Sequence, residues 1–277
     1  MSGRLYFDPG EARSKPHGED YIMANVARDL EGRSIICTGA GSGIGRSGAV
    51  IAARHGAHIL VTDISEEGGR ETVDLIRAEG GIAEFERIDI SKEEDAKRMV
   101  ERAIALFGKL DGAFNNAAVP QKTAMVHELT LDQWRRNIDV TLTGTFLCMK
   151  YELEAMLANG KGAIVNTSSG AGLKGFKLGS EYTAAKHGVV GLTRTAALEY
   201  SGLGIRINSI SPGGVRTPML EGAMKTNPDL EPYIVSTHPI GRMAHPDELG
   251  EAAVWLLSDA ASFVTGAILP VDGGHMA

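Results

Sequence analysis

The stretch that decides the fold is Thr38-Gly39-Ala40-Gly41-Ser42-Gly43-Ile44-Gly45, which lies between the apolar run Ser34–Thr38 and a helical pattern over residues 44–55. Glycines at a strand-to-helix turn let the backbone approach a pyrophosphate, and the start of the helix supplies free N–H groups and a partial positive charge. The spacing is T-G-x-x-x-G-x-G rather than G-x-G-x-x-G. The turn therefore predicts a phosphate cradle, with a merely flexible turn as the alternative.

The rest of the chain repeats this strand-then-helix pattern. Short apolar runs typical of buried strands lie at Ser34–Thr38, Ala57–Thr62, Ile82–Ile88, Leu110–Phe114, Ala163–Thr167, Ile205–Ile210 and Ala267–Val271. Amphipathic or alanine-rich stretches between them predict helices over 44–55, 66–79, 92–107, 131–158, 181–200 and 246–258. This alternation predicts an α/β fold with a single Rossmann-type, doubly wound parallel sheet and helices on both faces.

Two segments depart from the pattern. Residues 1–25 mix Pro, Gly and charges without a hydrophobic period, so we expect a disordered or peripheral N-terminal extension ahead of one domain over 26–277. Pro212–Pro246 is long and irregular, with an apolar helical fragment at Met219–Met224. Loops of this length are usually functional, so residues 218–240 are expected to form a substrate lid. Its apolar side chains indicate either helix packing or an apolar substrate pocket.

Composition limits the class of protein. The formal net charge of the 277 residues is −7, which argues against a nucleic-acid or anionic-membrane partner. No apolar run approaches the roughly 20 residues of a membrane span, and no signal-peptide pattern is present, so a cytoplasmic location is expected. Cys37 and Cys148 lie in apolar runs and predict buried, inert thiols. Nothing has metal-ligand spacing, so no metal site is expected.

The second apolar run ends at Asp63, 18 residues beyond Gly45. A carboxylate at this place can accept hydrogen bonds from both hydroxyls of an adenosine ribose. It would repel a 2′-phosphate by up to roughly 4 kcal/mol at about 4 Å. The next residues, Ile64 and Ser65, supply no compensating cation. The sequence therefore predicts NAD rather than NADP, with a solvated Asp that caps the next helix as the alternative.

Tyr182 and Lys186 are four residues apart and share one face of a predicted helix. A phenol has a pKa near 10, which a neighbouring ammonium lowers by stabilising the phenolate. Tyr182 can then act as a general acid or base. Ser169 follows a predicted strand 13 residues earlier, and its hydroxyl can hold the substrate oxygen. A Tyr–Lys pair is more often a surface pair, but three features here converge at the carboxyl ends of strands.

On these residues the sequence resembles the classical short-chain dehydrogenase/reductase family over about residues 30–274. The motifs that carry the resemblance are the glycine stretch Thr38–Gly45, Asp63, Asp89, Asn115-Asn116-Ala117, Ser169, Tyr182-Thr183-Ala184-Ala185-Lys186, Pro212–Thr217 and Val271-Asp272-Gly273-Gly274. The resemblance implies an oxidoreductase that interconverts a secondary alcohol and a ketone on a small, apolar or cyclic substrate. It also implies a homotetramer.

Residue roles follow from the same resemblance. Ser169 would stabilise the substrate oxygen, Tyr182 would transfer the proton, and Lys186 would bind the nicotinamide ribose and tune Tyr182. The other residues expected to bind NAD are Gly39, Ser42, Gly43, Ile44 and Gly45 at the pyrophosphate, Asp63, Asn115 and Ala117 at the adenosine ribose, Asp89 and Ile90 at the adenine, and Pro212, Gly213, Val215 and Thr217 at the nicotinamide.

The sequence departs from the family at two positions. Ala118 replaces the last glycine of the Asn-Asn-Ala-Gly segment. Thr141 stands where the family has its fourth catalytic residue, an Asn, while Asn137 lies four positions earlier. We expect the backbone carbonyl at residue 141 to preserve the proton relay, and the Thr hydroxyl to hydrogen-bond backward within its helix.

Two other functions are alternatives to an alcohol dehydrogenase. One is a catalytically silent dinucleotide sensor or scaffold, and the other is a 3-oxoacyl thioester reductase.

Several other polar and aromatic residues have no partner at mechanistic spacing. We interpret His127, His187, His238 and His245 as structural or surface residues, and Trp134 and Trp255 as core or subunit-contact residues. Arg194, Glu199 and Arg206 are predicted to be a solvated or interface charge set.

Overall fold

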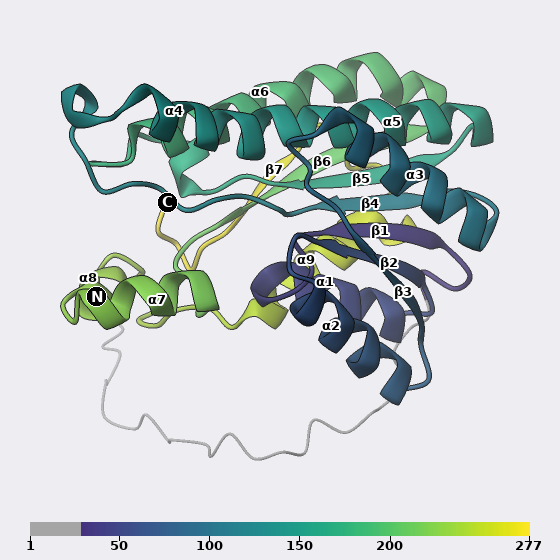
Figure 1. The fold of residues 1–277 in the computed structure, drawn as a ribbon, viewed down its shortest axis with the longest axis horizontal. Coiled ribbons are helices and arrows are strands. Elements are labelled where there is room, and N and C mark those ends of the chain that lie inside the picture. The colour runs from purple at the N-terminus through teal and green to yellow at the C-terminus, as the bar shows by residue number, and fades with distance from the viewer. Residues whose placement is uncertain (1–28) are drawn as a thin grey trace, which may run out of the picture.

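The computed structural model describes residues 29–277, and these form one sheet of seven parallel strands in the order β3-β2-β1-β4-β5-β6-β7 (Figure 1). The strands are β1 Ser34–Thr38, β2 His58–Asp63, β3 Ile82–Arg87, β4 Gly112–Asn115, β5 Gly162–Thr167, β6 Ile205–Pro212 and β7 Ile268–Val271. The strand order reverses between β1 and β4, which is where folds of this kind bind their ligands. The predicted doubly wound parallel sheet is confirmed. The predicted extension, 1–25, lies outside the described residues.

Helices cover both faces of the sheet. They are α1 Gly43–Arg54, α2 Glu66–Ala78, α3 Glu93–Phe107, α4 Leu131–Asn137, α5 Gly144–Asn159, α6 Ser180–Tyr200, α7 Pro218–Thr226, α8 Leu230–Ser236 and α9 Pro246–Leu257. In Figure 1, α1, α2 and α9 lie below the sheet, and α3, α5 and α6 lie above it. None of the helices in this described part combines the length and apolar character that a membrane span needs.

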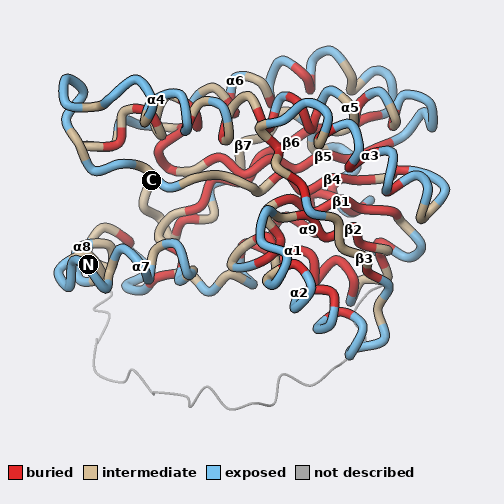
Figure 2. The backbone as a smooth tube through the Cα atoms, viewed as in Figure 1, coloured by how far each residue is buried: buried red, intermediate tan, exposed pale blue. Residues whose placement is uncertain are grey.

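The core consists of two apolar clusters, one on each face of the sheet (Figure 2). Alternate residues of β1 divide between them: Ile35 and Cys37 pack with α1 and α9, whereas Ile36 packs with α3 and α5. All five residues of β1 are buried, as expected for a strand with helices on both sides. The predicted burial of both thiols, Cys37 and Cys148, is confirmed.

The stretch 131–158, predicted as one continuous helix, is divided in the structure. After α4 a π-helical segment spans Ile138–Thr143, in which the amide of Gly144 donates to the carbonyl of Asp139, five residues back. The hydroxyl of Thr145 donates to the carbonyl of Thr141 at 2.8 Å. One extra residue in a turn barely changes the apolar period over a long helix, so the sequence pattern did not reveal the insertion.

The irregular region Pro212–Pro246 contains two short helices, α7 and α8, which stand apart from both helical layers (Figure 1). The Thr217 hydroxyl caps α7 by accepting from the amide of Leu220, and Pro218 occupies the first turn. Neither helix buries a residue. Their apolar side chains therefore do not form a packed core of their own.

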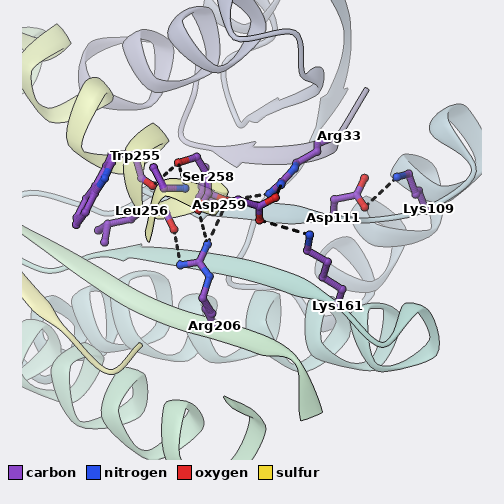
Figure 3. A network of polar contacts seen from close by, with 11 residues as sticks. Arg33, Lys109, Asp111, Lys161, Arg206, Trp255, Leu256, Ser258 and Asp259 are labelled. Carbon is purple, nitrogen blue, oxygen red and sulfur yellow. Dashed lines mark hydrogen bonds and ion pairs between the residues drawn. The ribbon is translucent and has the colours of Figure 1, made fainter. Parts of the chain in front are cut away.

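The edge of the sheet at the amino ends of the strands is held by charged side chains (Figure 3). The guanidinium of Arg206 donates to the carbonyl oxygens of residues 256, 257, 258 and 264, at the end of α9 and in the turn after it. Asp259 lies 3.4 Å from Lys161 and also pairs with Arg33. The prediction that Arg206 belongs to a solvated or interface charge set is wrong, because its donors serve backbone carbonyls.

Candidate active site

The glycine loop between β1 and α1 has the geometry of a phosphate cradle. Gly39 and Gly43 adopt left-handed conformations, with φ of 62° and 54°, which side chains disfavour. A Cβ atom at Gly45 would lie 2.2 Å from the carbonyl oxygen of Gly39, so only glycine allows this close approach. The Ser42 side chain makes no capping hydrogen bond, and the first turn of α1 has no acidic residue. The helix start can therefore receive an anion.

Asp63, the last residue of β2, reaches back to this loop. Its Oδ2 accepts from the amide of Gly41 at 2.9 Å, and its Oδ1 accepts from the amide of Ser65 at 2.8 Å. Ser65, not Asp63, is the residue that caps α2, since its hydroxyl accepts from Gly68. The carboxylate of Asp63 thus lies beside the glycine loop, where the sequence placed an adenosine ribose.

Arg46, in the first turn of α1, also contacts the glycine loop, although the sequence pattern did not single it out. Its guanidinium donates to the carbonyl of Gly41, to Glu71 at 2.8 Å and to Thr72 at 2.9 Å. Arg46 therefore braces the glycine loop against α2, and its charge is paired with Glu71. The only sequence signal was an Arg four residues after the loop's Ser42, which is common on helix surfaces.

The residues expected around the adenosine half divide into two groups. The backbone amide of Ala117 donates to the Thr38 hydroxyl at 3.1 Å, which holds the segment after β4 beside the glycine loop. The Asn115 side chain instead points into the core, where it donates to Glu152 at 2.8 Å. The Asn115 side chain is therefore not free for the predicted contact with the ribose. Ile90 is likewise buried in the core, and the Asp89 carboxylate accepts from Ser91.

Asn115 belongs to a buried polar cluster beneath the site that sequence reasoning did not foresee. Glu152 of α5 is completely buried, and burial raises its pKa to about 8. Asn115 also donates to Asn166 at 3.2 Å, and Asn166 donates to the Thr193 hydroxyl at 2.9 Å. The cluster links β4, β5, α5 and α6 below the carboxyl edge of the sheet.

The segment after β6 faces the glycine loop. A Cβ at Gly43 would lie 3.2 Å from the Thr217 side chain, so these two predicted cofactor residues are neighbours although they are far apart in sequence. Val215 is buried and pairs with Ala244 as an isolated β-bridge. Pro212 is the last residue of β6, and the amide of Gly213 donates to Val271 at 3.2 Å. The structure thus brings the predicted pyrophosphate loop and the predicted nicotinamide segment together.

Ser169, Tyr182 and Lys186 converge at the carboxyl end of β5. Ser169 follows this strand, and Lys186 of α6 donates from Nζ to the Thr167 carbonyl at 2.7 Å. The Nζ atom lies 5.6 Å from the centre of the Tyr182 ring. Burial lowers the pKa of Lys186 to about 7. Burial also raises the pKa of Tyr182, opposed by a hydrogen bond with Ser169, so the expected lowering of the phenol pKa is not met by these side chains alone.

Thr141 lies within the π-helical segment and is completely buried. Its hydroxyl accepts from the amide of Val119 at 3.5 Å, so the expected backward bond within the helix is made by Thr145 instead. Asn137 is also buried, and its side-chain amide donates to the carbonyl of Pro120 at 3.4 Å. Both residues therefore hold the segment that follows β4, and the carbonyl of Thr141 faces the Thr145 hydroxyl.

Comparison with known proteins agrees with this geometry. The sequence pattern of the family described as enoyl-(acyl carrier protein) reductase matches residues 39–276. A 2,5-dichloro-2,5-cyclohexadiene-1,4-diol dehydrogenase of Sphingobium indicum is 53% identical over 250 residues, which cover 90% of this chain and 99% of that protein. A cyclohexanol dehydrogenase of Acinetobacter sp. is 47% identical over 254 residues, covering 92% and 98%.

Solved structures show the same likeness. Levodione reductase superposes with a TM-score of 0.85 and 36% sequence identity, over 88% of this chain and 98% of that one. The structural match therefore extends over most of the chain, and the family pattern over residues 39–276 includes the segment that carries Tyr182 and Lys186. With this fold, this site and these relatives, the chain belongs to the short-chain dehydrogenase/reductase family of oxidoreductases.

Proposed function

We propose that this chain is an NAD(H)-dependent dehydrogenase that interconverts a cyclic secondary alcohol and its ketone. The observation that carries the proposal is the convergence of Ser169, Tyr182 and Lys186 at the carboxyl end of β5. A hydroxyl, a phenol and a buried amine in this order can hold an alcohol oxygen, remove its proton and pass that proton on.

The chemistry of the oxidation divides between cofactor and protein. NAD, when bound, supplies the acceptor for the hydride that leaves the carbinol carbon. The hydroxyl of Ser169 orients the substrate oxygen, and Tyr182 in its phenolate form takes the proton as the O–H bond breaks. Burial opposes this form because it raises the pKa of Tyr182, so the phenolate depends on positive charge nearby. The Lys186 amine stabilises that phenolate when it is protonated. Because the pKa of Lys186 is about 7, this amine can exchange a proton near neutral pH.

NAD fits the residues of the site. The left-handed glycines and the uncapped start of α1 suit a pyrophosphate. Asp63 lies beside the loop with a carboxylate that would bind ribose hydroxyls and repel a 2′-phosphate. Arg46 does not offset this repulsion, since its charge is paired with Glu71. We therefore infer that NAD is preferred over NADP.

The choice of a ring substrate rests on the relatives and on the lid. Both reported dehydrogenases are named for six-membered-ring alcohols. Segment 218–240 of this chain presents apolar side chains that are not buried in a core, including the exposed Met219 and Tyr233. We infer that these side chains provide the apolar contacts for a carbocycle with one or two hydroxyl groups.

A substrate panel tests the proposal. Purified protein is mixed with NAD or NADP and with cyclohexanol, cis-1,4-cyclohexanediol or 2-hexanol, and the absorbance of the reduced cofactor is followed. We expect turnover with NAD and the ring alcohols, and little with 2-hexanol. A 3-oxoacyl thioester with NADH is the arm that would support a thioester reductase. Binding of NADH without turnover of any alcohol or ketone would favour a dinucleotide sensor.

We also infer that the chain forms a homotetramer. Large apolar side chains are exposed on two separate surfaces, with Trp134 and Phe146 on α4 and α5 and Trp255 on α9. Neither tryptophan belongs to the core clusters, which leaves the subunit-contact interpretation. Two different self-complementary surfaces are what a dihedral tetramer needs. Light scattering should give four times the 29.3 kDa of one chain, and a monomer would contradict the inference.

A further inference from the structure

His238 occupies a junction between the lid and the predicted nicotinamide loop. It lies two residues after α8, is only 6% exposed, and was interpreted from sequence as merely structural or surface. Its Nε2 accepts from the backbone amide of Gly214 at 2.8 Å. Its Nδ1 lies 2.6 Å from the carbonyl oxygen of Ile234, inside α8. One imidazole therefore joins the lid helix to the loop that follows β6.

The hydrogen bonds of the His238 ring determine which of its two nitrogens carries the proton. The amide of Gly214 can only donate, so Nε2 carries no proton. The carbonyl of Ile234 can only accept, so Nδ1 carries the proton and donates. The ring is thus a neutral imidazole with both nitrogens paired, and it bridges two backbone groups that belong to different segments.

A second histidine holds the plane of the first. The ring of His275, in the C-terminal tail, stacks on His238 with centroids 4.7 Å apart and planes inclined by 12°. Nδ1 of His275 donates to the carbonyl of Thr237 at 2.8 Å. The tail therefore fastens the end of the lid from the other side, and His238 has little freedom to rotate away from Gly214.

Close packing around the His238 ring restricts the loop that follows β6. A Cβ atom at Gly213 would lie 2.5 Å from Nε2 of His238, and one at Gly214 would lie 2.3 Å from the Ile234 side chain. The carbonyl of Gly214 accepts from the amide of Ala244 at 2.9 Å, so this glycine is held through both its amide and its carbonyl. The position of Gly214 thus depends on where α8 and His238 lie.

We propose that His238 is a positioning residue that locks the lid to the nicotinamide loop, so that segment 218–240 and residues 212–217 set the nicotinamide end of the dinucleotide site together. The proposal rests on the proposed function for the identity of the cofactor. Replacing His238 with a residue that has no acceptor at the place of Nε2 would leave the partly buried amide of Gly214 unpaired. The loop would then be free of the lid. The adenosine end, which Asp63 and the glycine loop form, would not change.

Calorimetric binding of two ligands tests this. NADH reaches both ends of the site, whereas ADP-ribose lacks the nicotinamide. For His238→Leu we expect the Kd of NADH to rise about tenfold and the Kd of ADP-ribose to stay within about twofold of wild type. His238→Gln, whose Oε1 can accept from Gly214, should restore most of the NADH affinity. His127→Leu, at an exposed histidine, is the matched control.

Each possible result either supports or overturns the positioning role of His238. Equal weakening of both ligands by His238→Leu would mean that the residue only stabilises the fold, and the proposal fails. Unchanged NADH affinity, or a Gln variant as weak as the Leu variant, also overturns it. Wild-type protein that binds neither ligand would refute the proposed function itself, which is a different result from any of these.

Discussion

The Nζ atom of Lys186 donates a hydrogen bond of 2.7 Å to the carbonyl oxygen of Thr167, the last residue of β5. This contact fixes the amine at the carboxyl edge of the sheet, 5.6 Å from the centre of the Tyr182 ring. Lys186 is only 2% exposed, and the loss of water around it is what lowers its pKa to about 7 from 10.5. Site geometry and fold stability are therefore linked through one side chain.

The first prediction concerns the stability of the Lys186 site without cofactor. A lysine whose folded pKa lies below its unfolded value destabilises the fold as the pH falls, because the unfolded chain binds the proton first. The free energy of unfolding of the wild type should include a component that falls between pH 10.5 and about 7. Lys186→Met should lack that component and turn over far more slowly. Urea titrations at several pH values measure the free energy of unfolding of both proteins. Identical pH profiles for the wild type and Lys186→Met would contradict the prediction.

Tyr182→Phe keeps the ring and deletes the proton-transferring hydroxyl. We expect turnover to fall by about 10²–10⁴-fold, because general acid–base catalysis is lost. The affinity for NADH should stay near the wild-type value, since the phenol contributes to chemistry more than to cofactor binding. Steady-state kinetics and calorimetry on the same preparation separate the two effects. Turnover within a few-fold of wild type would remove Tyr182 from the mechanism.

Asp63 should set the choice between NAD and NADP. We expect NAD(H) to bind at least about tenfold more tightly than NADP(H), which corresponds to about 1.4 kcal/mol of repulsion. Asp63→Asn can still accept from the Gly41 amide but removes the charge, so the preference should shrink while the loop stays in place. Asp74→Asn, on the exposed face of α2, is the control. Equal affinities in the wild type would show that Asp63 does not meet the ribose.

Thr141→Asn restores the residue that the family has at this position. Because the carbonyl of residue 141 is present with either side chain, we expect turnover to change by less than about tenfold, or about 1.4 kcal/mol of barrier. The hydroxyl of Thr145 should keep its bond to that carbonyl. Kinetics with the best ring alcohol from the panel decide the point. An inert wild type with an Asn variant more active by orders of magnitude would favour the sensor over the dehydrogenase.

Glu152 gives the opposite pH dependence from Lys186. Burial raises its pKa from 4.5 to about 8, so the folded chain keeps a proton that the unfolded chain has lost. Stability should therefore be greatest below pH 4.5 for this group and decline as the pH rises to about 8. Glu152→Gln keeps an acceptor for Asn115 and cannot ionise, so it should remove this decline. Thermal melts from pH 5 to pH 9 compare the two proteins, and parallel curves would contradict the assignment.

The sequence predicted the sheet, and it predicted that Ser169, Tyr182 and Lys186 lie together, because both depend on local signals. Left-handed glycines, a strand-terminal Asp63 and a Tyr–Lys pair each carry a chemical requirement in their residue type and spacing. The π-helical turn around Thr141 was hidden because one extra residue in a single turn barely changes the apolar period over a long helix. The inward turn of Asn115 was missed since its partner, Glu152, is 37 residues away, and only the tertiary structure brings the two together.

Arg206 places one cation on four backbone carbonyls at the amino edge of the sheet, across the strands from Tyr182. Anchorage and catalysis are thereby assigned to opposite margins of the same parallel sheet. Engineering can use that separation. Libraries of variants at residues 218–237, made to accept new alcohol substrates, leave Arg206 and its contacts unchanged. The seven strands then stay the same in every variant. A redesigned lid needs only to keep His238 to remain bonded to the loop after β6.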